Sequence, residues 1–221
     1  MSDIPNTSQK KNNNKNIYTV IICLLTAVAV VPLLAPTLVA VSSGFTQTDG
    51  TAENIYCIFR GILAVALVIG TVSFTVNKKK SALAIPSFIA FVTCLFPLFE
   101  NVTLMTDAIQ TVHKLNMTID YTLYIVNIGL YLLLTLLGLF NGLFAAGILK
   151  SDFIVLFLSV ITSLATILLA IDKHLTLQIP VYEILTFVCA SPIALIPTFL
   201  VMSSDKTTPK EKKTKARRYR K

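Results

Sequence analysis

The segment YTLYIVNIGLYLLLTLLGLFNGLFAAGIL at residues 121–149 decides the fold, because it contains no charged side chain. A helix needs about 20 apolar residues to cross the ~30 Å hydrocarbon core of a bilayer, and this segment exceeds that length. In lipid the backbone N–H and C=O groups must pair within the segment itself, which makes it a helix. We therefore expect a transmembrane helix here.

Five more apolar segments occur along the chain, at about 17–43, 56–76, 81–99, 153–171 and 181–202. Charged residues make up only 14% of the chain, whereas a soluble domain typically carries about 25%. The sequence thus predicts an all-α integral membrane protein, a polytopic bundle of six transmembrane helices that fills residues 17–202. We expect the polar flanks, residues 1–16 and 203–221, to be disordered and cytoplasmic.

Lysine and arginine are sorted to alternate ends of these segments. Sixteen lie on one side, in residues 1–16, at 78–80, at Lys150 and in the tail, and only two on the other. The positive-inside rule places the sixteen in the cytoplasm, so both termini are cytoplasmic, as an even number of crossings requires. We expect the plasma membrane, or an endomembrane in a eukaryote. If the first segment is instead a cleaved signal peptide, five helices remain, although residues 17–43 are long for one.

The tail at 203–221 holds nine basic residues against Asp205 and Glu211. Such a tail can bind RNA or an acidic partner. Tyr219 is its only aromatic residue, however, so stacking on bases has little support. The tail therefore favours anionic lipid, and no nucleic-acid partner is expected.

Gly138, Gly142 and Ala146 form a small-xxx-small run in the segment at 121–149. This spacing lets helix backbones approach closely, and close packing drives helix association in lipid. We expect this face to lie inside the bundle or against partner membrane proteins. Contact of Gly138 and Gly142 with a second copy, or an accidental cluster, are the alternatives. The sequence does not indicate an oligomeric state.

Three ionisable residues lie near the predicted outer ends of the segments. Arg60 lies about one turn inside 56–76, Glu183 has a similar depth in 181–202, and Glu100 closes 81–99. An Arg60–Glu183 or Arg60–Glu100 pair is one interpretation. Extension of Arg60 to the headgroups, and contact with a ligand or ion, are two others. Asn127 and Asn141 are the deepest strongly polar residues.

Prolines recur in the first and last segments, as Pro32 and Pro36 and as Pro192 and Pro197. Each lacks an N–H and crowds the preceding turn, so each is a candidate hinge or a static bend.

No catalytic or metal-ligating motif occurs, neither His-Glu-x-x-His nor Gly-x-Ser-x-Gly. We therefore expect a non-enzymatic protein without cofactors, acting as a subunit or scaffold of a membrane complex that packs through residues 121–149. The alternative is a small solute-binding or transport protein with an outward-facing site between segments 56–76, 121–149 and 181–202. That alternative requires Arg60, Glu183 and Asn127 to converge on a pocket of at least ~300 Å³.

Overall fold

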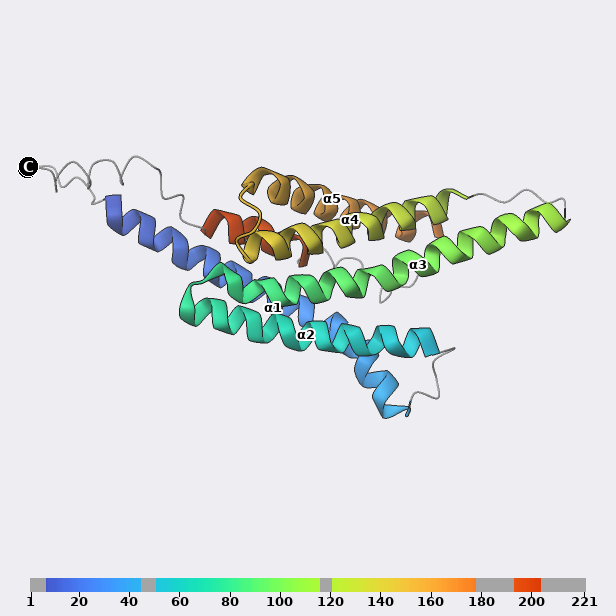
Figure 1. Cartoon of the computed structure of the whole chain (residues 1–221), viewed down its shortest axis with the longest axis horizontal. Coiled ribbons are helices and arrows are strands. Elements are labelled where there is room, and N and C mark those ends of the chain that lie inside the picture. Colours follow the sequence, from blue (N-terminus) through green and yellow to red (C-terminus); the bar gives the residue numbers. More distant parts are fainter. Residues whose placement is uncertain (1–6, 45–50, 116–120, 178–192, 204–221) are drawn as a thin grey trace, which may run out of the picture.

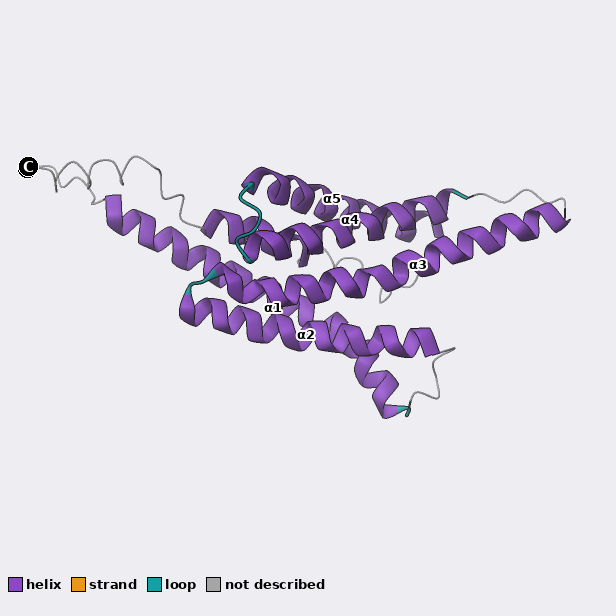
Figure 2. Cartoon of the chain, in the orientation of Figure 1, coloured by secondary structure: helices purple, strands orange, loops and turns teal. Residues whose placement is uncertain are grey.

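The structure is a computed structural model that describes residues 7–44, 51–115, 121–177 and 193–203. Helices are the only regular structure in these residues (Figures 1 and 2). In chain order they are α1 (Thr7–Ser42), α2 (Thr51–Asn77), the 3₁₀ turn η1 (Lys80–Leu83), α3 (Ala84–Leu115), α4 (Thr122–Ala145), α5 (Asp152–Leu177) and a short helix at Ile193–Ser203.

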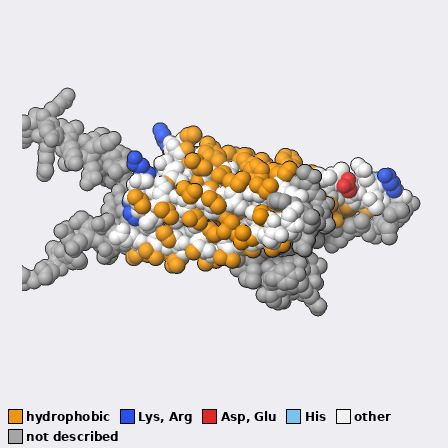
Figure 3. All heavy atoms as spheres, turned by 90° about the horizontal axis from the view of Figure 1, so that it is seen from below, with side chains coloured by type: hydrophobic (Ala, Val, Ile, Leu, Met, Phe, Trp, Pro, Cys, Tyr) orange, Lys and Arg blue, Asp and Glu red, His pale blue; other side chains and the backbone are white. Residues whose placement is uncertain are grey.

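Each of α1 to α5 contains a stretch long and apolar enough to span a membrane. Large apolar side chains such as Val31, Ile69 and Leu168 face outward and are more than half exposed. Figure 3 shows such side chains covering the middle of the molecule. This surface is typical of a membrane-embedded bundle, whose outer solvent is lipid.

The helices form a closed ring. Neighbours in the chain pack on one another, α1 on α2, α2 on α3, α3 on α4 and α4 on α5. The Ile193–Ser203 helix closes the ring between α5 and α1. Its Thr198 hydroxyl lies 2.7 Å from that of Ser159 in α5, and its Phe199 ring lies 6.4 Å from that of Tyr18 in α1.

Hydroxyl groups join α1 to α2. Thr26 and Thr71 share a hydrogen bond of 2.9 Å, and the Thr37 hydroxyl donates to the Cys57 carbonyl at 2.6 Å. Opposite Thr37, Gly61 leaves no room for a Cβ, which would lie 2.7 Å from the threonine methyl group. Small residues and interhelical hydrogen bonds hold helices together in lipid, so the α1–α2 interface has the features typical of a membrane protein.

Gly138 and Gly142 bring α4 against α3. A Cβ on Gly138 would lie 2.8 Å from the Phe91 backbone nitrogen, and one on Gly142 would lie 2.9 Å from the Phe88 ring. The chain therefore covers both glycines itself. This contact corresponds to the interpretation in which the face lies inside the bundle, while contact with a partner protein stays a prediction.

Ala146 lies outside this contact. It is exposed, and Ala145 takes the buried position instead. The reason is that α4 ends at Ala145 rather than continuing to 149. Gly147 adopts a left-handed φ of +82°, its N–H bonds the Phe144 carbonyl, and Ile148 bonds Leu143. This pattern is a Schellman motif, which stops a helix wherever a glycine supplies the positive φ.

Two helices run further than their apolar segments. α1 begins at Thr7, inside the part of the chain expected to be disordered, and α3 continues to Leu115, well beyond the end of the predicted segment at 99. Adding residues to an existing helix costs little, because one backbone hydrogen bond forms per residue fixed. Hydropathy marks where the lipid ends and does not mark where the helix ends.

Basic residues gather at one end of the described bundle. Lys78, Lys79 and Lys80 follow α2, and Lys150 precedes α5 at the same end, whereas Lys114 lies at the far end of α3 (Figures 1 and 3). The Ile193–Ser203 helix also ends on the lysine-rich side. Lys78–Lys80 and Lys150 thus lie at one end and Lys114 at the other, as the charge sorting predicts, while the orientation in a cell stays a prediction.

Candidate functional site

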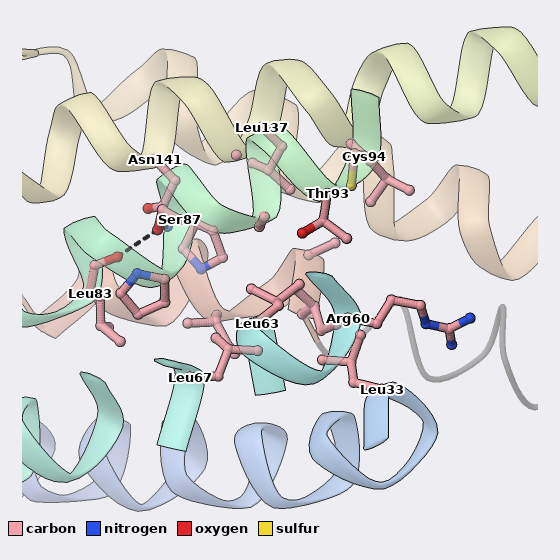
Figure 4. A pocket seen from close by; sticks show the side chains of 18 of the residues that line it. Leu33, Arg60, Leu63, Leu67, Leu83, Ser87, Thr93, Cys94, Leu137 and Asn141 are labelled. Carbon is pink, nitrogen blue, oxygen red and sulfur yellow. Dashed lines mark hydrogen bonds between the residues drawn. The ribbon is translucent and has the colours of Figure 1, made fainter. Parts of the chain in front are cut away.

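A cavity of about 240 Å³ lies inside the helix ring. Residues of α1, α2, η1, α3, α4 and the Ile193–Ser203 helix line it, and α5 contributes none of the described lining residues. Its middle is mostly apolar, with Leu63, Leu67 and Leu137 between the two polar ends and Thr93 as a polar side chain among them (Figure 4). Arg60 lies at one end, and Asn141 with Ser87 at the other.

The Arg60 guanidinium links α2 to α1 by a hydrogen bond. Its Nη2 donates to the Pro32 carbonyl at 2.8 Å, and its Cζ lies 5.5 Å from the centre of the Tyr56 ring. The Pro32 carbonyl needs this donor, because its usual partner four residues later is Pro36, which has no N–H. Arg60 thus completes the hydrogen bonding of a proline-interrupted helix.

Asn141 is 5% exposed and lies at the opposite end of the cavity. Its Nδ2 donates to the Ser87 hydroxyl oxygen at 2.7 Å, and that hydroxyl donates to the Leu83 carbonyl, also at 2.7 Å. The Asn141 Oδ1 is buried and has no hydrogen-bond partner in the described part of the chain. A buried amide oxygen normally has a partner, so this unpaired atom is unusual.

The structure brings two of the predicted polar residues, Arg60 and Asn141, to the same cavity. Asn127 is not among its described lining residues, although its Oδ1 is also buried without a partner. Glu100 is exposed, and no Arg60–Glu100 ion pair occurs in the described residues. Glu183 lies outside the described residues.

The candidate hinge prolines have different positions. Pro32 and Pro197 line the cavity from α1 and from the Ile193–Ser203 helix. Pro36 lies one turn after Pro32 in α1, which stays helical through both. Pro192 lies outside the described residues.

Sequence reasoning missed the α3 side of the cavity. Ser87, Ala90 and Cys94 line it, joined by Tyr56 from α2 and Tyr131 from α4. A signal was present, because Ser87, Ala90 and Cys94 recur at positions i, i+3 and i+7, the spacing of one helix face. Small side chains on that face leave space that the facing leucines do not fill.

Arg60 is the only charged residue among the described lining residues, and Leu, Ala and Pro dominate the rest. Such a cavity can exclude water and hold a small guest by apolar contact and one or two hydrogen bonds.

Comparison of the chain with protein-family models, with curated proteins and with solved structures found no match.

Proposed function

We propose that the chain is a non-enzymatic subunit of a membrane complex, whose contact with its partner is made outside the lipid by the end of α3. The observation that carries this proposal is the length of α3. Thirty-two helical residues reach about 48 Å, whereas the hydrocarbon core is only ~30 Å thick. We infer that about 18 Å of helix lies beyond the core, and Figure 1 shows the end of α3 extending past α2 and α4.

The projecting part carries an apolar stripe. Val102, Met105, Ile109 and Val112 recur at helical spacing, and Val102 and Ile109 are 43% and 38% exposed. Apolar side chains aligned on a helix outside lipid are the pattern that a partner helix covers. Because Gly138 and Gly142 already contact α3 of the same chain, we place the partner contact at this stripe instead.

The polar groups inside the ring support a structural role. Arg60 holds α1 through the Pro32 carbonyl, and Thr26 and Thr71 join α1 to α2. These groups are engaged in helix packing, which is the usual task of polar side chains between membrane helices.

The tail and the lysine-rich end complete the proposal. Lys78–Lys80 and Lys150 lie at the end of the bundle from which the basic tail continues, so we propose that this end faces the cytoplasm and binds anionic lipid. Each basic residue near such a surface contributes about 1 kcal/mol. The plasma membrane remains the predicted location.

The transport alternative has less support. The cavity, at about 240 Å³, is smaller than the ~300 Å³ at which ligand pockets usually begin, and Asn127 is not among its described lining residues.

The test is a photoreactive amino acid placed at Ile109, with Ile69 on the lipid-facing side of α2 as the matched control. Irradiation of native membranes should join the Ile109 probe to one protein, which also copurifies with the unlabelled chain at a fixed ratio. The Ile69 probe should capture lipid. A V102S/I109S variant should lose the copurifying protein while keeping its own fold. If the two probes give the same adducts, or if copurification survives this variant, the proposed contact is wrong.

A further inference from the structure

Three hydrogen-bond donors come together at one end of the cavity. Arg60 lies there, and Tyr56 from the same helix and Tyr131 from α4 also line the cavity. The three side chains are close enough to interact electrostatically with one another. Neither tyrosine hydroxyl makes a hydrogen bond to another residue in the described part of the chain. This end of the cavity therefore has more donors than acceptors, which is the condition that favours an anion.

Most of the Arg60 guanidinium is available for further hydrogen bonds. It carries five N–H donors, and within the described residues only Nη2 makes a hydrogen bond, to the Pro32 carbonyl. The contact with the Tyr56 ring uses its charge and none of its N–H groups. Glu100 interacts electrostatically with Tyr131, but it is exposed and is not among the described lining residues. No carboxylate of the described chain therefore lies in the cavity to balance the guanidinium.

The middle of the cavity offers little to a polar guest. Leu63, Leu67 and Leu137 form most of it, and the hydroxyl of Thr93 already donates to the Ile89 carbonyl at 2.8 Å. A buried water needs two to four polar partners, so water alone does not suit this part of the cavity. A guest that fits must be apolar along its length and anionic at the Arg60 end.

The dimensions of the cavity limit the size of such a guest. Asn141 and Tyr131 both line it and lie ten residues apart on α4, which corresponds to about 15 Å along the helix. A cavity of ~150 Å³ holds one benzene, so about 240 Å³ holds by proportion about ten non-hydrogen atoms. This volume, spread over that length, has the width of a single unbranched chain.

We propose that the cavity binds an unbranched aliphatic monocarboxylate of about ten non-hydrogen atoms, such as octanoate. Its carboxylate accepts hydrogen bonds from the Arg60 guanidinium and from the hydroxyls of Tyr56 and Tyr131, and its chain lies along the leucines. One negative charge balances the single positive charge, and a guanidinium suits a carboxylate because two of its N–H groups can bond both oxygens. Such a ligand goes beyond the contact proposed for the end of α3 and does not depend on it.

The full chain in lipid nanodiscs is labelled with octanoate carrying a diazirine on its chain, at about pH 8, where the carboxylate is ionised. Adducts mapped by mass spectrometry should lie on the lining residues of α2, α3 and α4. Octanoate and octanamide, which have the same size and differ in charge, then compete, and the concentration of each in the lipid is measured. Octanoate should compete at a concentration at least about tenfold lower, the ratio expected for a hydrogen bond to a charged group.

Two variants remove the donors while preserving the helix packing. Tyr131→Phe loses one hydroxyl and should weaken octanoate binding about fivefold. Tyr124→Phe, on the same helix and not among the described lining residues, is the matched control and should change nothing. Arg60→Met combined with Pro36→Ala should reduce octanoate to the level of octanamide. In this combination residue 36 supplies an N–H to the Pro32 carbonyl, so the loss reports on binding rather than on folding.

Equal competition by octanoate and octanamide on the unaltered chain overturns the proposal, even if a variant fails to fold. Adducts confined to lipid-facing residues such as Ile69 overturn it as well. Glu183 lies outside the described residues, and if octanoate binds only after Glu183→Gln, a carboxylate of the chain fills the site instead. The V102S/I109S variant should bind octanoate as the unaltered chain does, which separates this proposal from the partner contact on α3.

Discussion

Arg60 and Pro36 act on the same atom, the carbonyl oxygen of Pro32, one by supplying a donor and the other by lacking one. This arrangement accounts for a charged residue at membrane depth without a carboxylate partner in the described residues. An unpaired carbonyl in apolar surroundings costs about 1–3 kcal/mol, so the guanidinium contributes to stability through a backbone group of another helix.

Removing this donor should destabilise the bundle, and restoring the missing N–H should rescue it. We expect Arg60→Met to lower the free energy of unfolding by about 2 kcal/mol. Pro36→Ala in the same chain gives residue 36 an N–H for the Pro32 carbonyl and should recover most of this loss. Reversible unfolding in mixed micelles with increasing SDS measures both. Strictly additive effects of the two substitutions would show that they do not share this carbonyl.

Gly138 is confined by the backbone of α3, whereas a Cβ added to Gly129 on the same helix would meet nothing within 4 Å apart from its chain neighbours and the adjacent backbone of its own helix. Gly138→Ala should therefore lower the free energy of unfolding by about 1–3 kcal/mol, because the Phe91 backbone must move. Gly129→Ala is the matched control and should be neutral or stabilise by up to about 1 kcal/mol. Thermal unfolding of the two variants in the same detergent compares them, and equal effects would contradict the close approach of α3.

The spacing of Gly138 and Gly142 in the sequence indicates a close-packed face, but it cannot name the partner. Whether that partner is Phe91 of the same chain or a residue of another protein depends on which helices become neighbours. Likewise, Pro36 predicts a carbonyl in need of a donor, and only the packing of α2 shows that Arg60 supplies it. Local chemistry is readable from sequence, whereas the pairing of distant residues is not.

At the scale of elements, apolar length locates the crossings well and the helix ends poorly. The segment at 121–149 has no charged side chain, yet α4 stops at Ala145 because of the left-handed Gly147. The segment at 81–99 loses its apolar character at Glu100, yet α3 continues to Leu115. Burial in lipid requires apolar side chains, whereas a helix ends where a residue such as Gly147 adopts a left-handed conformation. The end of an apolar segment and the end of its helix therefore need not coincide.

The projecting end of α3 yields a direct test of this distinction. Backbone amides of residues 104–112 should exchange slowly with deuterium in nanodiscs, because helical hydrogen bonds protect them outside lipid as well as inside it. Thr103, Thr106 and Thr111 each donate to the carbonyl four residues earlier, as expected in a continuous helix. Exchange at the rate of an unstructured peptide, measured by mass spectrometry, would show that the helix ends near residue 99, where the apolar segment ends.

At the scale of the whole molecule, charge and topology are consistent. Three lysines follow α2 and one precedes α5, and the short hydroxyl-linked Ile193–Ser203 helix ends on the same side. Lys79 and Lys150 lie at the same end of the bundle, because α3 and α4 run in opposite directions (Figure 1). The side on which this end lies is set by the basic residues, since moving them across a membrane is unfavourable.

Single cysteines in a cysteine-free chain test the orientation. Lys79→Cys and Asp107→Cys place exposed thiols at opposite ends of α3, one before and one after its apolar stretch. In the plasma membrane, an impermeant maleimide applied to intact cells should label Asp107→Cys alone, and permeabilised cells should label both. In an endomembrane, selective opening of the plasma membrane should expose Lys79→Cys first. Labelling of Lys79→Cys alone from outside intact cells would show that the bundle has the opposite orientation. Labelling of both cysteines from one side would show that α3 does not cross the membrane.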